Sequence, residues 1–303
     1  MLTEHFHNTQ KDTGHYSNDL RYVLSLQNTI AAFEEIKTWE GYAKTPLHSL
    51  DSMASDIGVK NIYYKDESSR FGLGSFKALG GTYGVLKFIH HALKKEIGDE
   101  VSMKDIHAGK YSEQISKYTV TTATDGNHGR SVAFGAKLFG CKCQIYIHSE
   151  VSSGRQKAME DLEAMVNRIS GNYDASLQIC IEDAGKNNWY VISDTSYEGY
   201  TKYPRYIMAG YNVMAEEIID QIKDRPLPTH VFLQGGVGSF PGAICGYFWE
   251  KFPGNNIKFV LVESEYAPCL IRSAQNNQMT SVNINKETMM AGLSCGEPSL
   301  LGW

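Results

Sequence analysis

The sequence has few cysteines, no long apolar run and no excess of positive charge. Six cysteines are spread over 303 residues, and their spacings match no zinc site. No apolar run approaches the roughly 18 residues needed to cross a bilayer, and the N-terminus lacks the apolar core of a secretory signal. The 34 Asp and Glu residues outnumber the 29 Lys and Arg residues, which argues against a nucleic-acid partner. We therefore expect a cytoplasmic protein, with no membrane or nucleic-acid partner, that binds a small molecule.

The composition is that of a folded chain. Apolar residues make up 42% and charged residues 21% of the sequence, which excludes intrinsic disorder, and there is no internal repeat or low-complexity segment. A single hydrophobic core stops growing near about 250–300 residues, so this length suffices for one large or two modest domains. We expect the cysteines to be free thiols. Whether Cys269 and Cys295 pair depends on whether the fold brings them together, which the sequence leaves open.

Hydrophobic periodicity predicts alternating strands and helices. Apolar residues spaced by three and four indicate an amphipathic helix over 75–97, after a short strand at 61–65. Further strands are predicted at 120–122, 144–148, 189–192, 230–233 and 259–262, and further helices at 127–139, 153–166, 206–222 and 240–252. Residues 98–117 are expected to form a surface excursion, and 223–228 a hinge or a helix-to-strand loop. This alternation is typical of an α/β fold with a mostly parallel sheet.

A lysine lies in the first turn of a predicted helix. Between the strand and the helix, residues 65–77 form a glycine-rich turn that ends at Lys77. The positive end of the helix dipole disfavours a cation, so we expect the ammonium form of Lys77 to be disfavoured. A neutral amine is the nucleophile that forms a Schiff base with an aldehyde cofactor. Taken alone, however, the segment is better explained by a solvated lysine near a helix start.

Two more glycine-rich turns follow predicted strands. In the turn at 125–129 the glycines permit a close backbone approach, and Asn127 supplies both a donor and an acceptor. In the turn at 235–239 the backbone amides and the helix N-terminus suit a phosphate, and the Ser239 hydroxyl adds a donor. A dinucleotide-binding module is an alternative, kept open by Glu263, but this turn comes late in the chain and does not fit the dinucleotide pattern.

In this order the three segments resemble the fold type II pyridoxal 5′-phosphate enzymes, a group that contains threonine synthase, cysteine synthase and the serine and threonine dehydratases. Several motifs resemble the diaminopropionate ammonia-lyase family more closely. They are 65–68 (KDES) with 75–77 (SFK), 123–130 (ATDGNHGR), 194–200 (DTSYEGY) and 291–298 (AGLSCGEP). Asp125 discriminates between the groups, because the dehydratases and synthases typically have serine there. The resemblance covers residues 20–303.

The resemblance implies a fold, a cofactor and an assembly. The implied fold is two-lobed α/β, with open, mostly parallel twisted sheets flanked by helices, and the implied cofactor is pyridoxal 5′-phosphate. Residues 1–84 and 205–303 would form a large cofactor-binding domain, and 85–204 a smaller α/β domain. Chains of this family are longer, so the large domain is expected to be incomplete at Trp303 and to lack the residue that faces the pyridine nitrogen. A homodimer is also implied.

The resemblance also implies roles for individual residues. Lys77 would bind the cofactor covalently, and Asn127 would contact the 3′-oxygen of its ring. The residues implied to bind the phosphate are Gly235, Gly236, Val237, Gly238 and Ser239. Asp125 and Asp194 resemble acids that meet the extra amino group of a substrate, because paired carboxylates can bind a diamino acid with two cations. No catalytic role is expected for the residues whose simpler explanation is local packing, namely His128, Arg130 and His148.

The implied reaction is an α,β-elimination that converts 2,3-diaminopropionate to pyruvate and ammonia. Lys77 and Asp125 would remove the α proton from opposite faces, which accommodates both stereoisomers. Two alternatives remain open within the same cofactor chemistry. One is a dehydratase that acts on serine or threonine, and the other is a truncated, noncatalytic relative that binds the cofactor.

Overall fold

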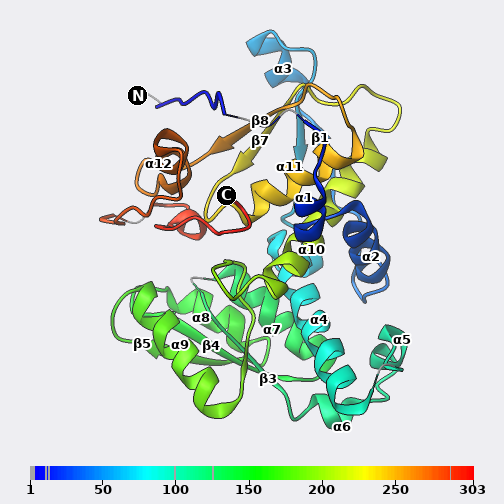
Figure 1. The fold of residues 1–303 in the computed structure, drawn as a ribbon, viewed down its shortest axis with the longest axis vertical. Coiled ribbons are helices and arrows are strands. Elements are labelled where there is room, and N and C mark those ends of the chain that lie inside the picture. The colour runs from blue at the N-terminus through cyan, green and yellow to red at the C-terminus, as the bar shows by residue number, and fades with distance from the viewer. Residues whose placement is uncertain (1–3, 11, 13, 99, 125, 287) are drawn as a thin grey trace.

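The computed structural model describes every residue except 1–3, 11, 13, 99, 125 and 287, and its strands fall into three sheets (Figure 1). An antiparallel pair joins β1 (Leu47–Ser49) to β2 (Tyr63–Lys65). The other two sheets are parallel, with the orders β5-β4-β3-β6 and β7-β8. The predicted α/β fold with mostly parallel sheet is therefore confirmed. No described helix has both the length and the apolar character needed to span a membrane.

The four-stranded sheet is covered by helices on both faces. Its strands are β3 (Thr119–Ala123), β4 (Lys142–His148), β5 (Met165–Ile169) and β6 (Tyr190–Val191). Because side chains alternate along a strand, Ala123 of β3 faces α9 (Tyr173–Asn187) while Val120 points to the opposite face, towards the main core with α7 (Asn127–Phe139). Every residue of β3 is buried, as expected of a central parallel strand.

Three helices cross closely beside this sheet, and glycines permit the crossing. α4 (Lys77–Ile97) packs against both α7 and α10 (Lys202–Gln221). A Cβ on Gly81 would come within 2.2 Å of the Ser131 hydroxyl, and one on Gly210 within 2.6 Å of the Leu79 carbonyl oxygen. The backbones of α4, α7 and α10 therefore meet where a larger residue does not fit.

The second parallel sheet carries the later part of the chain. β7 (His230–Gln234) leads through a glycine-rich loop to α11 (Ser239–Lys251), and β8 (Lys258–Val262) returns beside β7. α12 (Cys269–Asn276) and the short 3-10 helix η2 (Ala291–Leu293) follow. Figure 1 shows the C-terminus beside the loop between β7 and α11, with the four-stranded sheet on the other side of α10.

Short helices occupy the N-terminal part and the segment between α4 and β3. They are α1 (Asn18–Val23), α2 (Leu26–Ile36), α3 (Asp51–Ile57), α5 (Met103–His107) and α6 (Ser112–Ile115), with the 3-10 helix η1 (Arg70–Gly72). Most described residues of the expected surface excursion at 98–117 are exposed, but the segment is folded and anchored. Its apolar residues Val101, Ile106, Tyr111 and Ile115 are buried in the main core, so α5 and α6 cover one end of α4.

The predicted helix at 153–166 begins where expected but is shorter than predicted. α8 (Ser153–Glu160) ends after two turns, and β5 begins at Met165. Glu163 adopts a left-handed backbone conformation with φ of 68°, which ends the helical path and turns the chain into the strand. Residues 223–228 form part of the loop from α10 to β7, which agrees with the expectation of a helix-to-strand loop.

Candidate active site

Lys77 is the first residue of α4, as the sequence predicts. The turn before it uses left-handed backbone conformations at Phe71, Gly72 and Gly74, which reverse the chain between η1 and the helix. The Ser75 hydroxyl accepts a hydrogen bond from the Lys77 amide at 3.2 Å, and the Lys77 carbonyl accepts one from the Ser131 hydroxyl at 2.6 Å. The backbone of Lys77 is thus held on both sides.

The amine of Lys77 contacts Asp194, which lies 117 residues further along the chain in the loop after β6. Lys77 Nζ is 2.5 Å from Asp194 Oδ2, and the two side chains are 23% and 15% exposed. The Tyr211 hydroxyl donates a weaker hydrogen bond to the same oxygen at 3.4 Å. A carboxylate at this distance stabilises the ammonium form of Lys77, opposite to the effect expected from the helix N-terminus.

The carboxyl group of Asp194 is held in its ionised form. Burial opposes its ionisation, but the positive charges that His128 and Lys77 can carry outweigh burial and hold the pKa of this carboxyl well below its ordinary value. Tyr211 shows the reverse effect, since burial and then the neighbouring Asp194 raise its pKa well above the ordinary value. Asp194 is therefore the negative group of the cluster, and Tyr211 is a neutral donor to it.

The glycine-rich loop after β7 lies against this cluster. Gly236 and Gly238 have φ of 67° and 97°, and a Cβ on Gly235 would come within 2.6 Å of Glu263 Cγ. α11 begins directly after them at Ser239, whose hydroxyl donates to the Asp194 carbonyl at 2.7 Å. Asp194 therefore joins the two predicted features, because its side chain holds Lys77 and its main chain holds the start of α11.

Aromatic packing also brings these two features together. The rings of Phe76 and Phe240, which flank Lys77 and Ser239 in sequence, lie with their centroids 4.3 Å apart. Both rings also pack against Tyr211 of α10. The lysine and the glycine-rich loop, which are 158 or more positions apart in the sequence, therefore belong to one packed unit.

The turn at 125–129 is placed by α7. Thr124 Oγ1 accepts hydrogen bonds from the amides of Gly126 and Gly129, each at 3.1 Å, which fixes the turn. Asn127 is the exposed first residue of α7 and lies one helical turn before Ser131, the residue that holds the Lys77 carbonyl. Residues four apart share a helix face, so Asn127 is on the side of α7 that meets Lys77. Asp125 lies outside the described residues.

His128 is a part of the cluster that the sequence did not reveal. Its imidazole is 5% exposed, Nε2 is 2.8 Å from the Ile192 carbonyl oxygen, and Nδ1 is 3.7 Å from Asp194 Oδ2. Burial and then the neighbouring Lys77 charge lower the pKa of His128, against an opposing effect of Asp194. The expectation that packing alone explains this residue is incomplete, because the ring faces the lysine–carboxylate pair.

The last residues of the chain pack on the glycine-rich loop. The Ser299 amide donates to the Val237 carbonyl at 2.7 Å, and Ser299 Oγ accepts from the Ser196 amide at 2.8 Å. A Cβ on Gly302 would come within 2.5 Å of the Gly238 carbonyl carbon. The loop that carries Asp194 and the glycine-rich loop are therefore both held by residues 299–302.

Two cysteines lie beside the same loop, and neither forms a disulfide. Cys269 Sγ donates to the Gly236 carbonyl at 3.5 Å, and Cys295 Sγ is 4.0 Å from the position that a Cβ on Gly236 would take. Burial raises the pKa of Cys269 to about 12. The fold thus brings both cysteines to Gly236 without a bond between them.

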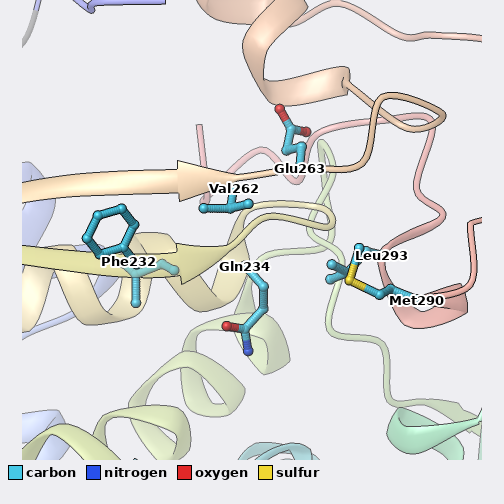
Figure 2. A pocket seen from close by; sticks show the side chains of 7 residues that line it. Phe232, Gln234, Val262, Glu263, Met290 and Leu293 are labelled. Carbon is cyan, nitrogen blue, oxygen red and sulfur yellow. The ribbon is translucent and has the colours of Figure 1, made fainter. Parts of the chain in front are cut away.

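An apolar cavity of about 240 Å³ opens at the carboxyl ends of β7 and β8 (Figure 2). It is lined by Phe232, Leu233, Gln234, Val262, Glu263, Met290 and Leu293. Of the described residues with a predicted role, only Glu263, the acid of the dinucleotide alternative, lines the cavity. The Glu263 carboxylate accepts from the amides of Leu270 and Ile271 at 2.9 and 2.7 Å, and it therefore caps α12 instead of offering an acid to a ribose.

Comparisons with known proteins identify the family of the chain. A family model described as pyridoxal-phosphate dependent enzyme matches residues 38–303. The chain is 38% identical to diaminopropionate ammonia-lyase of Escherichia coli (strain K12) over 264 residues, which cover 87% of this chain and 65% of the relative. Identity to the Salmonella typhimurium (strain LT2) protein of the same name is 38%, with coverage of 93% and 71%.

A solved structure gives the same result for the fold. The crystal structure of diaminopropionate ammonia lyase from Escherichia coli in complex with an aminoacrylate-PLP azomethine reaction intermediate superposes with a TM-score of 0.84 at 35% identity. The match covers 98% of this chain and 72% of that one. The chain thus spans about two thirds of the length of the relatives it matches.

Proposed function

We propose, because the chain belongs to the pyridoxal-phosphate dependent enzyme family, that it uses pyridoxal 5′-phosphate to eliminate ammonia from 2,3-diaminopropionate, with pyruvate as the other product. The observation that carries the proposal is the lysine–carboxylate pair of Lys77 and Asp194 held against the glycine-rich loop. The names of the relatives support the choice of substrate.

The residues present fit the cofactor. The loop Gly235–Ser239 offers backbone amides at the N-terminus of a 13-residue helix, which suits a phosphate dianion. A side chain at Gly235 or Gly238 would clash with its surroundings, because a Cβ at either position lies within 3.2 Å of a neighbouring side chain. Lys77 would hold the aldehyde carbon and Asn127 the ring oxygen, and the bound cofactor supplies an electron-withdrawing ring that stabilises a carbanion.

Lys77 and the side chains around it would then have different acid and base roles. In its neutral form the Lys77 amine can accept the α proton, and the Ser131 and Ser75 contacts keep the start of its helix fixed. Asp194 is anionic and can pair with the second ammonium group of a diamino acid, which serine and threonine lack. Asp125 remains the proposed second acid and base, for the other stereoisomer.

Borohydride reduction tests the attachment at Lys77. The purified protein with pyridoxal 5′-phosphate should absorb in the visible range, and reduction followed by peptide mapping should label the peptide that contains Lys77. Lys77→Ala should lose the label, whereas Lys95→Ala, which removes an exposed lysine of the same helix, should keep it. A label on any other lysine would refute the assignment.

Substrate comparison separates the remaining alternatives. Release of ammonia and keto acid should be faster from 2,3-diaminopropionate than from serine or threonine, because only the first has a second ammonium group to pair with Asp194. The reverse order would favour a dehydratase. Colour and a label at Lys77 without turnover would favour a noncatalytic relative.

We further propose the two-domain division, with a large domain of 1–84 and 205–303 and a small domain of 85–204, and a cytoplasmic homodimer. In support of the division, each proposed domain has its own parallel sheet. The boundaries fall within α4 and α10, which pack together and would connect the domains. Light scattering on the purified protein tests the dimer, and a monomeric mass would refute it.

A further inference from the structure

The imidazole of His128 has one satisfied nitrogen and one unsatisfied nitrogen. Nε2 lies 2.8 Å from the Ile192 carbonyl oxygen, whereas Nδ1 is buried and has no hydrogen-bond partner among the described residues. Asp194 Oδ2 lies 3.7 Å from Nδ1, which is too long for a hydrogen bond. A buried polar atom without a partner is uncommon in a folded protein and requires a physical reason.

The contact with Ile192 fixes the tautomer. A carbonyl oxygen only accepts hydrogen bonds, so Nε2 must carry the proton, and in the neutral ring Nδ1 presents a lone pair. That lone pair faces the Asp194 carboxylate, which has no proton to donate. The arrangement becomes favourable only when Nδ1 also binds a proton, because an imidazolium would then face an anion.

Burial and the neighbouring charge on Lys77 both oppose a positive charge on His128 in this arrangement. Lys77 Nζ occupies the same Asp194 oxygen that Nδ1 faces, and its positive charge opposes a second cation nearby. The titratable side chains of described residues that act on the ring are Lys77 from α4 and Asp194 from the loop after β6, and the neutral Tyr211 of α10 donates to Asp194. His128 and Lys77 therefore compete for one buried carboxylate.

We propose that His128 is a positioning residue that binds a proton at Nδ1 whenever the Lys77 amine is neutral, and so keeps a cation beside Asp194. The proposal deepens the proposed function, on which it rests, because a lysine that accepts the α proton must first be neutral. One N–H bond breaks at Lys77 and one forms at His128, with no change of oxidation state. Without this exchange, Asp194 would be left as a largely buried charge with no cation beside it, which is costly.

Titration of His128 in variants of Lys77 tests the exchange without any catalytic measurement. Nitrogen-15 labelled histidine spectra would follow the ring, with the His128 signals assigned by their absence in His128→Asn. Lys77→Gln removes the charge and Lys77→Arg keeps it, and neither variant forms the lysine bond to the cofactor. We expect the pKa of His128 to be higher in Lys77→Gln than in Lys77→Arg by about 1 unit or more, as for the loss of a like charge within a few ångströms.

A second variant identifies the carboxylate as the cause. In Lys77→Gln with Asp194→Asn the pKa of His128 should fall below its value in Lys77→Gln alone, because no anion is left for the imidazolium to pair with. Equal pKa values of His128 in Lys77→Gln and Lys77→Arg would overturn the proposal, as would a pKa in the double variant that equals the one in Lys77→Gln. The far-UV circular dichroism of each variant checks that it is folded, and Lys95→Gln serves as a lysine control on the same helix.

The proton exchange and the proposed function can be refuted independently of each other. If His128 responds as expected but no label appears at Lys77 after borohydride, the proton exchange stands and the proposed function fails. If the label and the turnover are present but His128 titrates alike in both variants, the proposed function stands and His128 has only a packing role.

Discussion

Asp194 is the residue on which the geometry of the candidate site converges. Its side chain contacts Lys77 and faces His128, and its carbonyl accepts from Ser239. These partners come from α4, α7 and the start of α11, so one residue links the three glycine-rich segments found in the sequence. Local sequence could not reveal this convergence.

Asp194→Asn tests the role of the carboxylate in substrate choice. The amide keeps the shape but cannot pair with the second ammonium of 2,3-diaminopropionate. We expect kcat/KM for 2,3-diaminopropionate to fall by at least about 30-fold, the effect of losing about 2 kcal/mol from a buried charge pair. The rate with serine, which has no second cation, should fall less.

The matched control is Tyr211→Phe, which removes only the long hydrogen bond to the same oxygen. We expect its effect on both substrates to be small. Equal losses of kcat/KM for 2,3-diaminopropionate and serine in Asp194→Asn would show that the carboxylate does not recognise the second ammonium group.

The individual residues differ in how far the sequence could predict them. Lys77 and the glycines of the 235–239 turn stand out locally, since a lysine at a helix start and glycines after a strand are visible in the chain itself. Their catalytic and binding roles stay predictions. His128 and Tyr211 could not be selected, because their contacts depend on how α7, α10 and the loop after β6 meet in space.

At the scale of elements, periodicity predicted the long helices better than the short segments. α4 and α10 have apolar faces that run for five turns, whereas α8 ends where Glu163 turns the chain with a left-handed conformation. The prediction does not include α9, although Leu177, Cys180, Ile181 and Ala184 have helical spacing. The short helices α5 and α6 lack enough turns to show a period.

The close crossing of α4 and α10 gives a prediction about packing. Gly210→Ala would place a methyl group 2.6 Å from the Leu79 carbonyl oxygen and 2.8 Å from Gly80 Cα. Because both neighbours are backbone atoms, the helices must move apart, and we expect a loss of about 1–3 kcal/mol in the free energy of unfolding. Chemical denaturation of both proteins measures the difference.

Gly185→Ala is the matched control for this packing effect. Gly185 is an exposed glycine within α9, and nothing lies within 4 Å of the position its Cβ would take. There the same substitution should stabilise the protein by about 0.5–1 kcal/mol, because alanine favours helix over glycine. A Gly210→Ala variant as stable as wild type would contradict the close helix crossing.

At the scale of the whole molecule, a buried ion cluster connects segments from the first and last thirds of the chain. Arg70 is 1% exposed and forms bidentate pairs with Glu67 and with Glu217, which is fully buried. Lys65 Nζ adds a 2.7 Å contact to Glu217. The cluster ties β2 and η1 to α10, and η1 belongs to the turn that leads to Lys77. The cluster therefore stabilises the turn that leads to Lys77, although its residues are not part of the candidate site.

Loss of the Glu217 charge should destabilise the protein in a manner that depends on pH. Burial opposes ionisation of Glu217, but hydrogen bonds and charges from Arg70 and then Lys65 outweigh burial and lower its pKa. A lowered pKa in the folded state gives stability that is present above the unfolded value, about 4.5, and is lost as the pH falls through the folded value. Glu217→Gln should therefore cost about 3–5 kcal/mol at pH 7.

Urea unfolding of wild type and Glu217→Gln from pH 7 to pH 3 checks both the size and the sign. The difference in the free energy of unfolding should stay constant down to about pH 5 and then shrink, because the wild-type carboxyl becomes neutral like the amide. Glu113→Gln breaks a fully exposed pair with Lys117 and should change stability by less than about 1 kcal/mol throughout. A difference for Glu217→Gln that is the same at pH 3 and pH 7 would mean that the Glu217 charge does not stabilise the junction of β2, η1 and α10.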